Sequence, residues 1–136
     1  MKKVKISDMK LEDDIIQNCE NAIDFLKKDL DLSQENFIIM GLNTKNKIVF
    51  TKTLFKGSIN ECIIDLKLIF REILINSCNG FIIGHNHPSG DLTPSEPDLK
   101  ISRNIKDASE ILGIRYLDNI IFDDEKYVSF YDEDLL

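Results

Sequence analysis

Cysteine is scarce in this 136-residue chain, and its three cysteines, Cys19, Cys62 and Cys78, stand far apart. An odd number of widely spaced cysteines predicts neither a disulfide framework nor a Cys-x-x-Cys zinc site. Free thiols are typical of a reducing compartment. We therefore expect a cytoplasmic protein without disulfides.

Long apolar segments are missing as well. No apolar run approaches the ~20 residues that a membrane-spanning helix needs. The lysines near the N-terminus are not followed by the apolar stretch of a secretory signal. The sequence thus predicts neither a membrane anchor nor a signal peptide.

Positive charge is in deficit, because 17 basic residues face 24 acidic ones and the net charge is −7. Proteins that bind a phosphate backbone broadly present a basic face, so this balance does not support direct nucleic-acid binding. The hydrophobic share of 43% and the length are those of one globular domain with its own core. We expect a polar N-terminal segment over residues 1–10 and a single domain over residues 11–136.

Histidine is nearly absent, yet the two histidines, His85 and His87, are two residues apart, and Asp98 follows eleven residues after the second. The apolar run Gly80–Gly84 indicates a buried strand that leads into His85. Residues two apart in an extended chain point to the same side, so both imidazoles can converge on one ion while Asn86 faces away. Two imidazoles and one carboxylate are a ligand set of catalytic zinc that leaves a position open for water. The sequence predicts one Zn²⁺ per chain and a zinc hydrolase.

Asp98 also has a purely structural interpretation. The residues Ser95-Glu96-Pro97-Asp98 are typical of a capping box at the start of a helix. Histidines in a loop rich in proline and glycine are often simply exposed to solvent. The three side chains fall together at ligand spacing beside a strand end, and this combination favours the metal site.

The remaining pattern predicts strands interleaved with helices. We therefore expect an α/β fold, a single-domain α-β-α sandwich with a mixed sheet. The expected helices cover about Leu11–Leu30, a stretch that ends near Cys78, and the residues after Ser95; the expected strands lie near Phe37–Leu42, Ile48–Leu54, Ile59–Ile64, the run before His85, Ile114–Phe122 and Tyr127–Phe130.

The metal-site segment resembles a known signature. His85-x-His87-Pro88-x6-Ser95-x2-Asp98 matches the JAMM motif of the JAB/MPN metalloprotease fold at every fixed position. The residue sequence His-Asn-His-Pro-Ser-Gly-Asp resembles that of the RadC branch of the family, whose members have long been labelled DNA repair proteins. The resemblance is clearest from about residue 32 to the C-terminus. It implies the JAB/MPN, cytidine deaminase-like architecture.

The resemblance also implies catalytic residues. In JAMM enzymes a glutamate just before the first core strand works with the zinc-activated water, which nominates Glu35 as general base. Glu72 is the alternative, within the amphipathic stretch Leu66–Leu74. The motif places Ser95 to hydrogen-bond a developing oxyanion. The implied reaction is hydrolysis of an amide bond in a protein or peptide, as in a peptidase or isopeptidase.

The chain departs from the RadC pattern in places. It has Leu66-Lys67-Leu68 where relatives read Pro-Arg-Glu, and Asn119 where they carry a histidine. It has no room for the helix-hairpin-helix region that precedes the domain in full-length members. These departures spare the ligand set but weaken an inherited role on DNA. A second hypothesis is therefore a catalytically silent, metal-stabilised module that acts by binding in DNA repair or mobile-element processes; the substrate and the oligomeric state stay open.

Overall fold

The computed structural model of the chain describes residues 14–57 and 64–136. The polar segment 1–10, the expected helix start at Leu11 and most of the expected strand Ile59–Ile64 lie outside this range. Within the described residues the elements follow in the order α2 (Cys19–Lys27), β1 (Asn36–Leu42), β2 (Ile48–Lys56), α3 (Leu66–Ile75), β3 (Gly80–Asn86), α4 (Glu96–Leu112), β4 (Arg115–Phe122) and β5 (Tyr127–Ser129).

The strands form one mixed sheet in the order β2-β1-β3-β4-β5. β1 pairs antiparallel with β2 and with β3, whereas β3 and β4 are parallel and are joined through α4. β5 returns antiparallel to β4. The β3-α4-β4 crossover brings the C-terminal end of β3 close to the start of α4.

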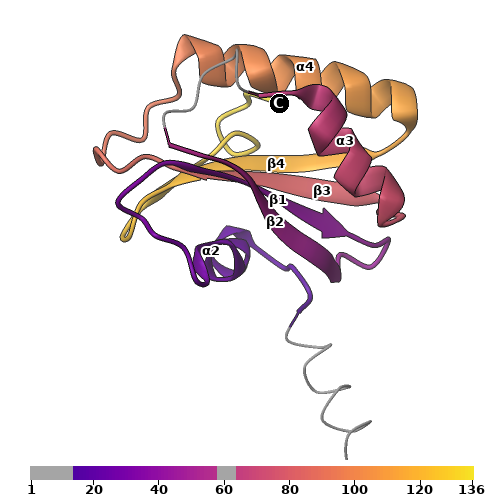
Figure 1. Cartoon of the computed structure of the whole chain (residues 1–136), viewed down its shortest axis with the longest axis horizontal. Helices are drawn as coiled ribbons and strands as arrows, with labels where there is room; N and C mark the ends of the chain where they lie inside the picture. The colour runs from indigo at the N-terminus through magenta and orange to yellow at the C-terminus, as the bar shows by residue number, and fades with distance from the viewer. Residues whose placement is uncertain (1–13, 58–63) are drawn as a thin grey trace, which may run out of the picture.

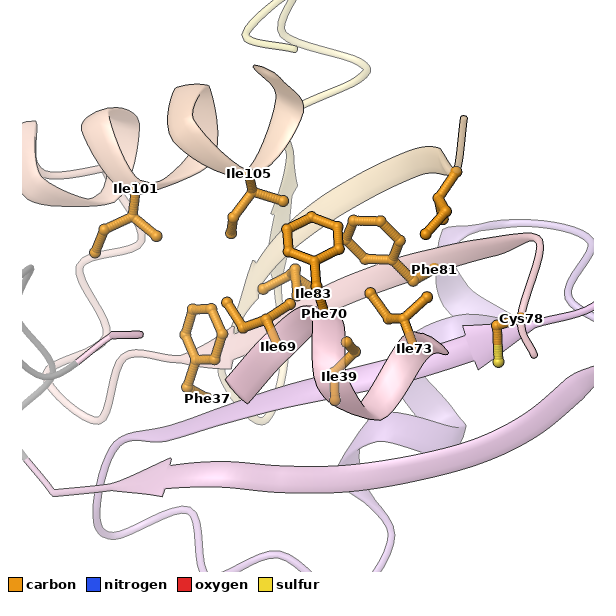
Figure 2. Packing of buried hydrophobic residues seen from close by; sticks show 11 residues of the cluster. Phe37, Ile39, Ile69, Phe70, Ile73, Cys78, Phe81, Ile83, Ile101 and Ile105 are labelled. Carbon is orange, nitrogen blue, oxygen red and sulfur yellow. The ribbon is translucent and has the colours of Figure 1, made fainter. Parts of the chain in front are cut away.

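The helices cover both faces of the sheet, with α3 and α4 on one side and α2 on the other (Figure 1). Strand alternation explains this, since alternate apolar residues of one strand face opposite layers. Phe37 and Ile83 pack under α3 and α4 (Figure 2), whereas Ile38 and Ile82 pack against α2. The expected α-β-α sandwich with a mixed sheet is confirmed.

Helix α2 is shorter than the sequence predicts. It begins at Cys19 because the side chain of Asn18 accepts a hydrogen bond from the Asn21 N–H, which caps the helix at 2.8 Å. Before the cap the chain is extended, and Ile15 forms a β-bridge with Lys47. The expected helical start was therefore wrong over the described residues, because apolar residues at helical spacing continue into a segment that pairs with the sheet. At the other end the helix stops at Lys27, because the backbone of the C-cap Lys28 (φ −58°, ψ 123°) leaves the helical region before Leu30 is reached.

The cysteines at positions 19 and 78 are free thiols, as expected. Cys78 is buried in the core under α3, and Cys19 is half-buried with its sulfur 3.7 Å from an oxygen of Asp118. Among the residues that the structure describes, no helix combines the length and the apolar character needed to cross a membrane.

Gly84 of β3 lies against Leu26 of α2. A Cβ at this position would lie 2.7 Å from Cδ1 of Leu26, inside van der Waals contact. Gly84→Ala is therefore expected to destabilise the fold by about 1–3 kcal/mol through overpacking. Urea unfolding measures this, and in a Leu26→Ala background, where space is available, the same substitution should cost nothing. An equal cost in both backgrounds would contradict the overpacking explanation.

Candidate metal centre

The site lies where β3 ends and α4 begins. His85 is near the end of β3, His87 follows the strand, and Asp98 is in the first turn of α4. The Nε2 atoms of the two histidines are 2.9 Å apart. Oδ1 of Asp98 lies 3.7 Å from Nε2 of His85, and Oδ2 of Asp98 lies 3.6 Å from Nε2 of His87. One ligand atom from each residue lies within 4.8 Å of the others. The structure thus brings together the three side chains that the sequence nominated.

A backbone contact orients His87. Its Nδ1 lies 2.8 Å from the carbonyl oxygen of Asp91. A carbonyl can only accept, so Nδ1 carries the proton and the neutral ring keeps the lone pair of Nε2 for the interior of the site. A histidine ligand whose other nitrogen donates to a carbonyl is the usual arrangement around protein-bound metals.

The charge states of the three residues suit a cation. His85 is only 4% exposed, and burial lowers its pKa to about 4 even though Asp98 acts in the opposite direction. Burial tends to raise the pKa of Asp98, but contacts with His87, His85 and Ser95 outweigh it and hold the pKa at about 2. The hydrogen bond to Asp98 raises the pKa of His87, and burial opposes this effect. At neutral pH the site therefore contains a carboxylate beside a neutral His85, the forms in which these side chains bind metal.

Ser95 and Asp98 form the capping box that the sequence indicates. The Asp98 N–H donates to Ser95 Oγ at 3.1 Å, and the Ser95 N–H donates to Asp98 Oδ2 at 2.8 Å. The second bond fixes the carboxylate in the orientation that faces the histidines. In the first bond the hydroxyl of Ser95 acts only as an acceptor, so its own proton is not used by the cap. Capping and site formation are therefore two roles of the same pair.

The side chains of this group suit a divalent metal ion. Two imidazoles and one carboxylate come together, and the orientation of His87 and Asp98 is set by hydrogen bonds to residues outside the group. Zinc sites that carry out hydrolysis use three such protein ligands. The residues His85, His87 and Asp98 can therefore hold a metal ion.

Glu35 lies next to this group. It directly precedes β1, and Phe37 of β1 pairs with His85 of β3. Glu35 is two residues before Phe37, and His87 is two residues after His85, so both lie at the same end of this strand pair. The charge of Glu35 raises the pKa of His87. The side chain that the sequence nominated as general base is thus close enough to act on this site electrostatically.

Glu72, the other candidate base, faces a different partner. It lies on α3 and forms an ion pair with Lys52 of β2. In the sheet, β1 lies between β2 and β3. The ion pair of Glu72 with Lys52 on β2 is therefore separated by one strand from β3, which carries His85. The geometry favours Glu35.

Asn86 is a residue at the site to which sequence analysis gave no role. It faces away from the histidines, as expected, but it is 1% exposed and bonds to the segment that leads into β1. The sequence contained a signal, because asparagine is disfavoured in strands and a buried one needs hydrogen-bond partners. Asn36, also 1% exposed, carries the same signal at the start of β1.

Two cavities are relevant to the position of the site. A cavity of about 280 Å³ adjoins His87 and Pro88 and is bordered by the acidic residues 123–125. A larger one of about 690 Å³ lies against α2, with Cys19 and Asp118 in its wall. Asp118 is saturated there by donors that include Ser129 and the backbone of Tyr131, so its carboxylate serves the fold. Of the three candidate ligands, His87 lines the smaller cavity, whereas His85 and Asp98 are not in its wall.

Comparison with known proteins agrees with this geometry. A family model described as a RadC-like JAB domain matches residues 16–135. A UPF0758 protein of Bacillus licheniformis is 41% identical over 90% of this chain and 55% of its own length. A UPF0758 protein of Staphylococcus haemolyticus is 41% identical over 79% of this chain and 47% of its own, and the UPF0758 protein YsxA of Bacillus subtilis is 36% identical over 90% and 53%. The chain spans about half the length of these curated relatives.

Proposed function

This chain belongs to the RadC-like JAB domain family, and from that membership and the geometry of its site we propose that it is a zinc-dependent hydrolase of amide bonds. The observation that carries the proposal is the convergence of His85, His87 and Asp98 with Glu35 beside them. The reaction class is that of a metallopeptidase or isopeptidase acting on a protein or peptide. The proposal includes one Zn²⁺ per chain and the cytoplasmic location expected from the thiols.

The proposed mechanism assigns roles to five residues and the ion. Zinc, when bound, acts as a Lewis acid that lowers the pKa of a coordinated water to about 7. His85, His87 and Asp98 hold the ion, and the hydrogen bonds of His87 and Asp98 keep their ligand atoms aimed at it. Glu35 accepts the proton that the attacking water loses and passes it to the leaving amine nitrogen.

Ser95 completes the proposed machinery. Its hydroxyl proton, which the helix cap does not use, can be donated to the oxygen that becomes negative as the carbonyl is attacked. The Oγ atom of Ser95 also accepts the hydrogen bond from the Asp98 N–H, so Ser95 supports both the helix and the proposed reaction.

Ser95→Ala is therefore expected to lower both activity and stability. Loss of an oxyanion donor costs about 3 kcal/mol in the transition state, and loss of a serine cap costs about 1 kcal/mol of folding free energy. Turnover at saturating zinc measures the first effect, and urea unfolding measures the second. Unchanged turnover at full zinc occupancy would remove Ser95 from the mechanism.

The experiment that tests the function combines metal analysis with a substrate screen. Tag-free protein is assayed for zinc per chain by elemental analysis, and the zinc-loaded protein is incubated with fluorogenic peptide amides and fluorescein-labelled casein. Near one zinc per chain with cleavage that a chelator abolishes would support the proposal. A protein that takes up no zinc on reconstitution would contradict it and favour the binding module.

A further inference from the structure

The side chain of Asn86 joins the metal-ligand segment to the segment that carries Glu35. Asn86 is the last residue of β3 and stands between His85 and His87. Alternate strand residues face opposite sides, so its amide points to the face of the sheet opposite the imidazole of His85. There it meets residues 32–36, which lead into β1.

All hydrogen-bonding groups of the Asn86 side-chain amide are directed at this one segment. Its Oδ1 accepts from the Asn36 backbone N–H at 2.8 Å and lies 3.1 Å from Asn36 Nδ2. Its Nδ2 donates to the carbonyl of Gln34 at 2.9 Å and approaches that of Leu32 at 3.4 Å. An asparagine side chain offers two N–H donors and two acceptor lone pairs, and all four are directed here.

Glu35 lies between the two backbone groups that Asn86 binds most closely. The carbonyl before it, on Gln34, and the N–H after it, on Asn36, share the same amide as partner. The carbonyl of Glu35 itself accepts from the Gly57 N–H at 2.9 Å. The backbone of Glu35 is thus fixed on both sides, directly before β1, whose Phe37 pairs with His85 of β3.

We propose that Asn86 is a positioning residue that sets the place of Glu35 relative to the two histidine ligands. Because Asn86 lies between those histidines in the chain, its hydrogen bonds tie the position of Glu35 to the position of both ligands. A general base must come within about 3 Å of the proton it removes, and a misplacement of about 1 Å can cost a hundredfold in rate. The catalytic part of this inference rests on the proposed hydrolase function, whereas the structural part does not.

A double-mutant cycle tests the catalytic part. The enzymes compared are wild type, Asn86→Ala, Glu35→Gln and the double variant, each zinc-loaded and assayed on the fastest-cleaved peptide amide. We expect Asn86→Ala to lower kcat by about a hundredfold with little change in KM. If Asn86 acts through Glu35, then Glu35→Gln lowers kcat by about a thousandfold in wild type but by less than about tenfold in the Asn86→Ala background. Independent, multiplicative losses would overturn the proposal.

Amide hydrogen exchange of the zinc-loaded protein tests the structural part without any substrate. Asn86→Ala should speed exchange over residues 31–36 by tenfold or more, on the order of the loss of one buried hydrogen bond, while zinc per chain stays at the wild-type value. Asn86→Asp keeps the size and the acceptor oxygen but loses both N–H donors, so it should loosen the same residues and serves where the alanine variant fails to fold. Unchanged exchange over residues 31–36, or loss of zinc in both variants, would overturn the proposal.

Asn119 provides the matched control. It is a buried asparagine, 4% exposed, on β4, which flanks β3 on the side away from β1, and its amide donates to the hydroxyl of Tyr116 on the same strand. Asn119→Ala should leave exchange over residues 31–36 and kcat unchanged, and a loosening equal to that of Asn86→Ala would contradict a specific role for Asn86. If wild-type protein cleaves none of the probes, the hydrolase proposal fails, and the exchange result alone decides whether Asn86 positions Glu35.

Discussion

Glu35→Gln is expected to leave zinc bound and to lower amide hydrolysis by about a thousandfold, within the range for a positioned general base. Glutamine keeps the size and polarity of the side chain but cannot take up a proton at neutral pH. Zinc should stay because Glu35 lies beside the His85, His87 and Asp98 group without belonging to it. The measurement is kcat on a peptide amide together with zinc per chain.

Glu72→Gln is the matched control for this prediction. It makes the same chemical change at the other candidate base, which pairs with Lys52 on β2. We expect kcat to be unchanged and folding stability to fall by no more than about 1 kcal/mol, the usual size of an ion pair near the surface. A fully active Glu35→Gln enzyme together with an inactive Glu72→Gln enzyme would reverse the assignment of the base.

Asp98→Asn is expected to abolish stoichiometric zinc binding while helix α4 keeps its cap. The asparagine oxygen can still accept the Ser95 N–H, which Asp98 Oδ2 accepts at 2.8 Å, but the anionic ligand is gone. In wild type, free zinc at a thousandfold excess over its Kd stabilises the fold by about 4 kcal/mol, so a chelator should lower Tm markedly. In Asp98→Asn the chelator should leave Tm unchanged.

Two further variants separate ligand loss from cap loss. His87→Ala removes a ligand away from the helix start and should also lose zinc. Ser95→Ala weakens the cap but leaves the Ser95 N–H in place for Asp98, and it should keep zinc near one per chain. Near one zinc per chain in Asp98→Asn would remove Asp98 from the ligand set.

The sequence predicts that His85, His87 and Asp98 come together because these residues lie close to one another in the chain. His85, His87 and Asp98 come from one strand end, one loop and one helix start, and the alternation of β3 together with the capping signal of α4 determines their directions. Such short-range rules hold wherever the flanking elements form. The mixed sheet follows from the same interleaved pattern of strands and helices.

The features that the sequence did not predict depend on distant contacts. The chain before α2 carries apolar residues at helical spacing, yet Ile15 pairs with Lys47, and the helix begins only at the Asn18 cap. The bonds of Asn86 to Gln34 and Leu32 span about fifty residues, and strand pairing alone makes them possible. Local patterns cannot indicate which partner a buried amide will find.

The β3-loop-α4 origin of all three ligands has a consequence for the order of folding. Closing this short loop costs little chain entropy, whereas bringing residues 31–36 to β3 requires closure of a loop several times longer. If the chain binds zinc as proposed, we expect the ion to bind once β3 and α4 have met, before β1 has docked. On the proposed function, we therefore expect capture of the ion to precede hydrolytic activity during folding, because Glu35 joins the site only when β1 docks.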